Sequence, residues 1–327
     1  MLQDKHGRTI SYLRLAVTDR CNLRCFYCMP DCGIDFVERK DLLSFEEMIR
    51  LAEIHAEMGV NKVRITGGEP FVRRDLLSFI RRLSAIKGID DIHVTTNGTV
   101  SADKVKEFKD AGISGINLSL DTLNQAKFLE ITRRDEFHKV MNTFEQLLKE
   151  KIQVKINVVH MYGVNHDEMN DLIQLAKDNP IDVRFLEEMP FNGSDFLRKE
   201  SWSANQIENE LRSLHPGITK LDSPITETSK NFSIPGFKGR VGIIPSFTRT
   251  ICGGCNRIRV TPTGQLKTCL YDSGVLDLRH LLRTESDNQV IEKAIRLAIS
   301  LKPKDGFEAE SSNNTSQSRE SMATIGG

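Results

Sequence analysis

Apolar and polar residues follow two periods between residue 11 and about residue 190. Short runs rich in β-branched residues alternate with longer stretches in which apolar residues recur every three or four positions. The runs predict buried strands, and the longer stretches predict amphipathic helices. Because a helix or a long loop follows each strand, we expect parallel β/α units in an open sheet or in a complete or partial barrel. Six strands are predicted, at 11–18, 62–66, 91–96, 115–120, 153–160 and 182–188.

The clearest helix signal lies at residues 45–58. Ser44 and Glu47 have the spacing of a capping box, one apolar stripe follows, and Gly59 supplies a C-terminal signal. Further helices are predicted to start near Asp75, Ser101, Asn124 and His166.

The β/α rhythm stops after residue 190, where a mixed, turn-rich stretch begins. Further on, the segments 257–261 and 265–270 flank Pro-Thr-Gly and predict a hairpin, and a helix is expected near 288–301. The last stretch is rich in Ser and Asn, which favours a flexible tail. We therefore expect a β/α barrel, a C-terminal region and a tail, over residues 1–190, 191–304 and 305–327.

Composition narrows the class of protein only slightly. Of the 327 residues, 39% are hydrophobic and 28% are charged, as in ordinary globular proteins, and the formal net charge is zero. This balance excludes an overall electrostatic attraction to nucleic acid or to a membrane surface. The sequence shows no long apolar run and no signal-peptide pattern at its first residues, so we expect a cytoplasmic protein without a membrane partner.

Seven cysteines fall into two groups, and the odd number argues against a disulfide framework. In the first group, Cys21, Cys25 and Cys28 follow the first predicted strand within eight residues. Three thiolates at this spacing are suited to one face of an iron–sulfur cluster. Cys32 could instead complete a structural zinc site, and the spacing leaves that alternative open. A bacterial ferredoxin run is excluded, because its first gap is two residues rather than three.

The second group contains Cys252, Cys255 and Cys269 and spans the predicted hairpin. Arg257 and Arg259 follow at alternate positions and therefore share one face of the strand, beside these cysteines. Zinc is again the simple alternative, but only three cysteines are present. An incomplete ligand set beside two cations suggests that a substrate completes the coordination.

Four predicted strands each carry one cation between two apolar residues. If the apolar neighbours pack against outer helices, the cations point into the barrel. Unpaired buried cations are costly, so their presence suggests a polyanionic ligand such as a nucleoside triphosphate. The four residues are Arg14, Arg64, Lys155 and Arg184.

Polar motifs also collect where the predicted strands end. RITGGEP ends the second strand, and its two glycines would let the backbone approach a ligand closely. TTNG, SLD and EEM end later strands, at 95–98, 119–121 and 187–189. In β/α barrels and open α/β sheets the site lies at the carboxyl ends of the strands, so we expect the site there.

CNLRCFYC, residues 21–28, fits the CxxxCxxC motif of radical S-adenosylmethionine (SAM) enzymes, with Tyr27 as the usual aromatic residue before the third cysteine. Together with RITGGEP, INLSLD, RFLEEMP, CGGCNRIRVTPTGQLKTCL and the terminal IGG, it makes the chain resemble the GTP 3′,8-cyclases over nearly its whole length. These are the radical SAM enzymes of molybdenum cofactor biosynthesis. The resemblance implies an α/β fold, an incomplete (β/α)6 TIM-like barrel closed by a smaller C-terminal α+β region.

The resemblance also implies the reaction and its cofactors. The enzyme would be a lyase that converts GTP to 3′,8-cyclo-7,8-dihydro-GTP, the first step of the pathway. One 4Fe–4S cluster would leave an iron open to SAM, and a second cluster in the C-terminal region would leave an iron open to GTP. By motif, their ligands would be Cys21, Cys25 and Cys28 for the first cluster and Cys252, Cys255 and Cys269 for the second.

Further site residues are carried over by motif. SAM would contact Tyr27, Gly68, Ser119 and Met189. GTP would contact Arg14, Arg64, Thr95, Lys155, Arg257 and Arg259. The residues implied in catalysis are Arg257, Arg259, Gly326 and Gly327. Arg184 fits its motif without a defined role, and Cys32 is expected to be an ordinary thiol.

The implied partners are GTP, SAM, a reductant such as flavodoxin or ferredoxin, and a downstream pyranopterin-forming enzyme. The resemblance also allows a homodimer. Two alternatives stay open at this point: a peptide-modifying radical SAM enzyme with an auxiliary cluster, and a zinc-stabilised β/α binding protein.

Overall fold

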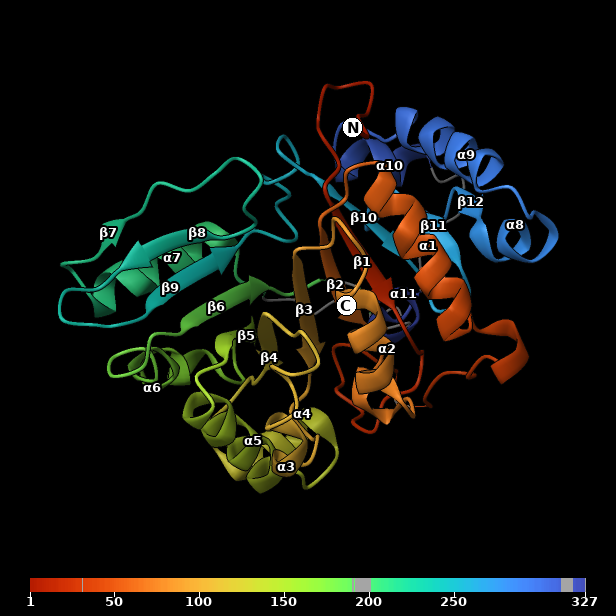
Figure 1. Cartoon of the computed structure of the whole chain (residues 1–327). Coiled ribbons are helices and arrows are strands. Elements are labelled where there is room, and N and C mark those ends of the chain that lie inside the picture. Colours follow the sequence, from red (N-terminus) through yellow and green to blue (C-terminus); the bar gives the residue numbers. More distant parts are fainter. Residues whose placement is uncertain (31, 190, 192–200, 313–319, 327) are drawn as a thin grey trace.

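One sheet organises the whole chain in the computed structural model, which describes residues 1–30, 32–189, 191, 201–312 and 320–326 (Figure 1). The sheet has 12 strands, in the order β12-β11-β10-β1-β2-β3-β4-β5-β6-β9-β8-β7. Eight neighbouring strands, from β10 to β9 in this order, run parallel to one another. Among the described residues the end strands β12 and β7 do not pair with each other, so the barrel is open.

The six predicted strands are confirmed, and they form the centre of the parallel sheet in sequence order. Three of them have the predicted bounds, and the other three are one to three residues shorter. The strands are β1 (Tyr12–Ala16), β2 (Lys62–Thr66), β3 (Asp91–Thr96), β4 (Gly115–Ser119), β5 (Gln153–His160) and β6 (Asp182–Glu187).

The C-terminal region extends this sheet at both edges. Strand β10 (Arg257–Val260) pairs parallel with β1, and β9 (Arg240–Ile244) pairs parallel with β6. The predicted hairpin is confirmed, because β11 (Gln265–Lys267) pairs antiparallel with β10. The other antiparallel strands are β7 (Thr219–Lys220), β8 (Lys230–Ser233) and β12 (Leu276–Asp277). The incomplete β/α barrel with a smaller C-terminal α+β region is therefore confirmed. The C-terminal strands extend its sheet at both edges, and the sheet does not close among the described residues.

Helices cover the outer side of the sheet (Figure 1). The predicted capping box of α1 is present, with Glu47 N donating to Ser44 Oγ at 3.1 Å and Ser44 N to Glu47 Oε2 at 2.7 Å. The helices are α1 (Phe45–Glu57), α2 (Leu76–Ser84), α3 (Ala102–Val105), α4 (Gln125–Thr132), α5 (Phe137–Lys149), α6 (Met169–Gln174), α7 (Ala204–Leu214), α8 (Leu278–Thr284), α9 (Asn288–Ser300), α10 (Gly306–Ser312) and α11 (Met322–Ile325). Three 3₁₀ turns lie at Arg39–Asp41, Pro70–Val72 and His166–Glu168.

Two features differ from the sequence prediction. Helix α7 lies in a stretch that its mixed composition left unassigned, although Ser203 and Gln206 form a capping box there. The segment for which a flexible tail is predicted contains two short helices, α10 and α11, in its described part. The division at residues 190 and 304 stays a prediction.

The apolar core lies between the sheet and the outer helices. The residues on either side of Arg14 and of Arg64, such as Leu13 and Val63, are fully buried in it, as strand alternation predicts. The cations between them point to the inner face. In the part of the chain that the structure describes, no helix is both long enough and apolar enough to cross a bilayer.

Candidate active site

Two adjoining cavities lie on the inner face of the parallel sheet. One is at the carboxyl ends of the strands, where the sequence predicts the site, and the other is lined by mid-strand residues such as Arg14, Arg64 and Arg184. The loop cavity, of about 1040 Å³ counting its part open to solvent, is lined by the loop of Cys21, Cys25 and Cys28. The arginine cavity, of about 1060 Å³ on the same measure, contains the second cysteine group. The cavities share Thr95, Asn157, Leu186, Met189 and Met322 as lining residues.

The cysteine loop is fixed by backbone hydrogen bonds. Arg24 N donates to Thr132 O at 2.9 Å and Phe26 N to Ile131 O at 3.1 Å, which attaches the loop to the end of α4. All three thiols of the motif line the loop cavity. Cys32 lies outside the cavity lining and is exposed.

Burial keeps these thiols protonated when no cation is near. Burial, with the Glu69 carboxylate nearby, raises the pKa of Cys21 to about 11. Burial, with Cys21 nearby, raises the pKa of Cys28 to about 12. Metal ions deprotonate the thiols that they bind, so this donor set fits a positively charged metal cluster. Across the described ranges, no three or more His, Cys, Asp or Glu side chains are grouped so as to hold a single metal ion.

Positions 67 and 68 require glycine for a reason that differs from the one inferred from the sequence. A Cβ atom at Gly68 would lie 2.4 Å from Arg20 O, and one at Gly67 would lie 2.4 Å from Thr18 O. Gly68 N donates to Thr18 O at 2.7 Å. The two glycines thus let the start of the cysteine loop, rather than a ligand alone, approach the end of β2.

Gly68→Ala is therefore expected to displace the start of the cysteine loop. We expect a loss of about 1–3 kcal/mol in the free energy of unfolding, because the backbone has to shift to admit the methyl group. Fewer irons should bind after reconstitution. Anaerobic urea denaturation and iron analysis measure both. Gly253→Ala is the matched control, since a Cβ atom there meets nothing within 4 Å. Equal stability and iron content in the two variants would contradict this interpretation.

The four residues expected to contact SAM, namely Tyr27, Gly68, Ser119 and Met189, all line the loop cavity. Tyr27 Oη donates to Asp121 Oδ2 at 2.7 Å, and Val159 N donates to Asp121 Oδ1 at 2.8 Å. Burial raises the pKa of Asp121 to about 6. Asp121 was not among the predicted site residues, although it belongs to the SLD motif at the end of β4.

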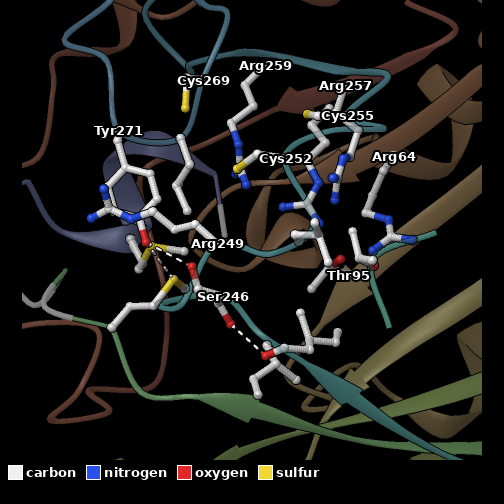
Figure 2. Close-up of a pocket in the computed structure, with 18 of the residues that line it drawn as sticks. Arg64, Thr95, Ser246, Arg249, Cys252, Cys255, Arg257, Arg259, Cys269 and Tyr271 are labelled. Carbon is white, nitrogen blue, oxygen red and sulfur yellow. Dashed lines mark hydrogen bonds between the residues drawn. The ribbon is translucent and has the colours of Figure 1, made fainter. Parts of the chain in front are cut away.

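Arginines gather in the second cavity (Figure 2). Arg259, Arg14 and Arg64 lie side by side on β10, β1 and β2, because their Cα atoms pair directly in the sheet register. Burial, together with the charge of Arg257, lowers the pKa of Arg259 to about 10. Arg184 also lines the cavity.

These five arginines share one feature, the lack of a carboxylate partner among the described residues. In the described part of the chain, no ion pair involves Arg14, Arg64, Arg184, Arg257 or Arg259. The buried Nε atoms of Arg14, Arg64 and Arg257 have no hydrogen-bond partner there. Buried cations with unused donors cost free energy, and a bound polyanion would offset it. The cavity therefore fits the phosphates of a nucleotide.

Two asparagines, the buried Asn117 and the half-buried Asn157, orient part of this group, and the sequence prediction did not include them. Arg184 Nη2 donates to Asn157 Oδ1 at 2.7 Å. The Asn117 oxygen accepts from Arg64 Nη1 at 2.7 Å and from Arg184 Nη2 at 2.5 Å in the amide orientation that satisfies the Asn117 side chain. The sequence does contain a signal that both side chains point inward, because each asparagine lies between two apolar residues on its strand, as the inward cations do.

Lys155 is the one predicted GTP contact that lines neither cavity. Its Nζ atom lies 3.8 Å from Asp182 Oδ2, near the start of β6. Burial, together with the charge of Arg184, lowers the pKa of Lys155. Thr95, by contrast, lines both cavities.

The second cysteine group lies in the arginine cavity, with Cys252, Cys255 and Cys269 on its lining (Figure 2). Burial alone would raise the pKa of Cys255, but the charges of Lys302 and Arg257 outweigh it and lower that pKa to about 6. A thiolate is the form that binds metal, so this donor set also fits a metal cluster.

The chain reaches the arginine cavity again at its C-terminal segment. Arg259 Nη1 donates to Gly326 O at 2.6 Å. A Cβ atom at Gly326, whose φ is +77°, would lie 2.6 Å from Thr66 Oγ1 and 2.8 Å from Ala16 Cβ, so only glycine fits there. Gly327 lies outside the described residues.

Comparison with known proteins gives two family matches. The model of the Radical SAM superfamily matches residues 15–176, and that of Molybdenum Cofactor Synthesis C matches residues 181–308. Among solved structures, Streptococcus suis SuiB has a TM-score of 0.63 at 12% identity, covering 91% of this chain and 72% of that chain. At that identity the likeness shows the fold alone.

Several curated proteins are similar over most of the chain. GTP 3′,8-cyclase of Clostridium perfringens is 41% identical over 92% of this chain and 93% of its own length. The mitochondrial GTP 3′,8-cyclase of Arabidopsis thaliana is 41% identical over 92% of this chain and 78% of its own length.

Molybdenum cofactor biosynthesis protein 1 of Bos taurus is 41% identical over 92% of this chain, which spans only 48% of that protein. The chain thus covers about half the length of its mammalian relatives. Membership of the radical SAM superfamily implies SAM and one 4Fe–4S cluster as cofactors. The joined cavities, the two cysteine groups and the close relatives that share this length together show that the chain belongs to the GTP 3′,8-cyclase family.

Proposed function

We propose that this protein converts GTP to 3′,8-cyclo-7,8-dihydro-GTP, the first step of molybdenum cofactor biosynthesis. The observation that carries the proposal is the pair of joined cavities. Three cysteine thiols line one of them, and five arginines without carboxylate partners in the described residues line the other. The names of the relatives agree with this reaction.

In the loop cavity, Cys21, Cys25 and Cys28 would hold a 4Fe–4S cluster, and Tyr27, Gly68, Ser119 and Met189 would bind SAM. When bound, these cofactors supply the one-electron reduction and the radical chemistry of the reaction. The protein holds the two ligands next to each other, since Thr95 and Met189 line both cavities. Tyr27 and Asp121 fix one wall of the loop cavity through their hydrogen bond.

In the arginine cavity, Arg14, Arg64, Arg257 and Arg259 would bind the GTP phosphates as charge-assisted donors, with Thr95 beside them. Asn117 and Asn157 hold Arg64 and Arg184 in place through neutral acceptors. Because these acceptors carry no charge, the full positive charge of the arginines is available to the phosphates. Lys155 stays a predicted GTP contact, and its position beside Asp182 suggests that it acts at longer range.

We further propose a second 4Fe–4S cluster on Cys252, Cys255 and Cys269, open to GTP. It would lie beside Arg257 and Arg259, for which we propose catalytic contacts with the substrate, and beside Gly326 and Gly327. The proposal also includes two protein partners, a reductant such as flavodoxin or ferredoxin and a pyranopterin-forming enzyme that takes the product. It further includes a homodimer and a cytoplasmic location.

Turnover by the reconstituted protein tests the reaction. Under anaerobic conditions we expect about eight irons per chain, with matching sulfide. With SAM, a chemical reductant and GTP, we expect one 5′-deoxyadenosine for each GTP consumed, and GTP should be needed for its rapid formation. ATP is the matched control substrate. A protein that contains zinc and no iron, or one that cleaves SAM with a peptide but not with GTP, would contradict the proposal.

A further inference from the structure

A fourth cation continues the row of arginines in the sheet. Lys267 on β11 pairs directly with Arg259 on β10 in the antiparallel register. Directly paired residues on antiparallel strands point to the same face, so the two side chains are neighbours. Lys267, Arg259, Arg14 and Arg64 thus form one row across four adjacent strands. Like charges at paired positions repel each other, and each cation needs an acceptor.

Lys267 differs from the other three cations because it has a carboxylate partner. Its side chain is only 1% exposed, and its Nζ atom lies 2.6 Å from Glu320 Oε2. Breaking this contact would leave the buried Lys267 ammonium without its carboxylate, which gives the chain a reason to stay at Glu320.

Glu320 begins a short segment, residues 320–326, that crosses both cavities. Ser321 Oγ donates to Cys28 O at 2.6 Å, which ties the segment to the first cysteine loop. Met322 lines both cavities. At the far end Gly326 O accepts from Arg259. The segment is therefore held at its two ends by Lys267 and Arg259, which are direct neighbours in one hairpin.

We propose that Lys267 and Glu320 are a positioning pair that fixes residues 320–326 between the two cavities and so sets Gly326 on Arg259. The pair does not touch substrate. Glu320 neutralises Lys267, the cation next to Arg259. The pair also holds the segment at the end opposite Gly326. The inference rests on the proposed function only where it concerns turnover, since the placement of the segment is a property of the protein by itself.

The test compares wild type with Glu320→Gln, Lys267→Met and the double variant. We expect kcat for GTP to fall by about 10-fold or more in each single variant, with unchanged iron content. SAM cleavage should exceed product formation, because the segment no longer occupies its place. The double variant should be no slower than the single ones, since both changes break one contact. Amide hydrogen exchange in 320–326 should be at least 10-fold faster in all three variants.

Glu292→Gln is the matched control. Its ion pair with Arg296 on α9 is 2.7 Å long and its side chain is 30% exposed, against 2.6 Å and 39% for Glu320. We expect wild-type kcat and exchange in this variant. Wild-type kcat together with unchanged exchange in Glu320→Gln would overturn the proposal. If wild type itself does not consume GTP, the proposed function fails, while the exchange measurement still decides the role of the pair.

Discussion

Cys25→Ala is expected to remove about four of roughly eight irons and to abolish formation of 5′-deoxyadenosine, whereas Cys32→Ala should change neither. Cys25 lies in the middle of the loop that lines the first cavity, and burial, with Cys28 nearby, raises its pKa well above the usual range. A bound metal would stabilise the thiolate there, and the other described thiols of that cavity, Cys21 and Cys28, are themselves assigned as ligands and so could not replace it. Cys32 is exposed, and its Sγ atom donates to the neighbouring Gly33 carbonyl oxygen at 3.6 Å.

Iron and sulfide analysis after anaerobic reconstitution measures the first effect, and chromatographic detection of 5′-deoxyadenosine measures the second. The two cysteine variants control for each other, because both remove one thiol from the same stretch of chain. Loss of iron in Cys32→Ala, or full SAM cleavage in Cys25→Ala, would contradict the assignment of the loop.

Arg14→Met is expected to change GTP affinity and stability in opposite directions. A hydrogen bond to a charged group contributes about 1.5–3 kcal/mol, so GTP should bind roughly 10- to 100-fold more weakly. Without GTP, however, Arg14 is a half-buried cation beside Arg259 and Arg64, its Nε atom is buried, and it has no carboxylate partner among the described residues. An apolar side chain of similar length removes this repulsion, and the free energy of unfolding should rise by on the order of 1 kcal/mol.

Equilibrium dialysis with GTP and anaerobic urea denaturation measure the two effects. Arg212→Met on α7 is the control, because Arg212 pairs with Glu208 at the surface and should affect neither quantity by much. If Arg14→Met binds GTP as wild type does, the arginine cavity is not the phosphate site. A lower free energy of unfolding in Arg14→Met than in wild type would contradict the stability prediction. It would mean that a group other than an ion-pair partner compensates the charge of Arg14.

Much of the fold could be predicted because strand periodicity is a local signal. The bounds of β2, β3 and β5 follow from their apolar runs alone. The same alternation correctly predicts that Arg14, Arg64 and Arg184 point inward, and all three line the arginine cavity. Asn117 and Asn157 follow the same pattern, but a single neutral amide in a strand did not suggest a binding site, and both were missed.

Non-local relations could not be predicted in the same way. The pairing of β10 with β1 joins residues about 245 positions apart, and nothing local in either segment specifies the partner. The tight contact of Gly68 with Arg20 likewise depends on how two loops meet. Helix α7 is a different case. Its capping box can be found in the sequence, but the many polar residues around it make the apolar periodicity of the helix hard to recognise.

The pairing of β9 and β10 with opposite edges of the sheet also bears on synthesis. The edge of β6 stays open until β9 has left the ribosome, and the edge of β1 stays open until β10 has followed. An open edge can pair with another chain. Contacts this distant in sequence form late and slowly. The β/α part of the nascent chain therefore has unpaired strand edges for most of the time of synthesis. Chaperones would protect it from aggregation at this stage.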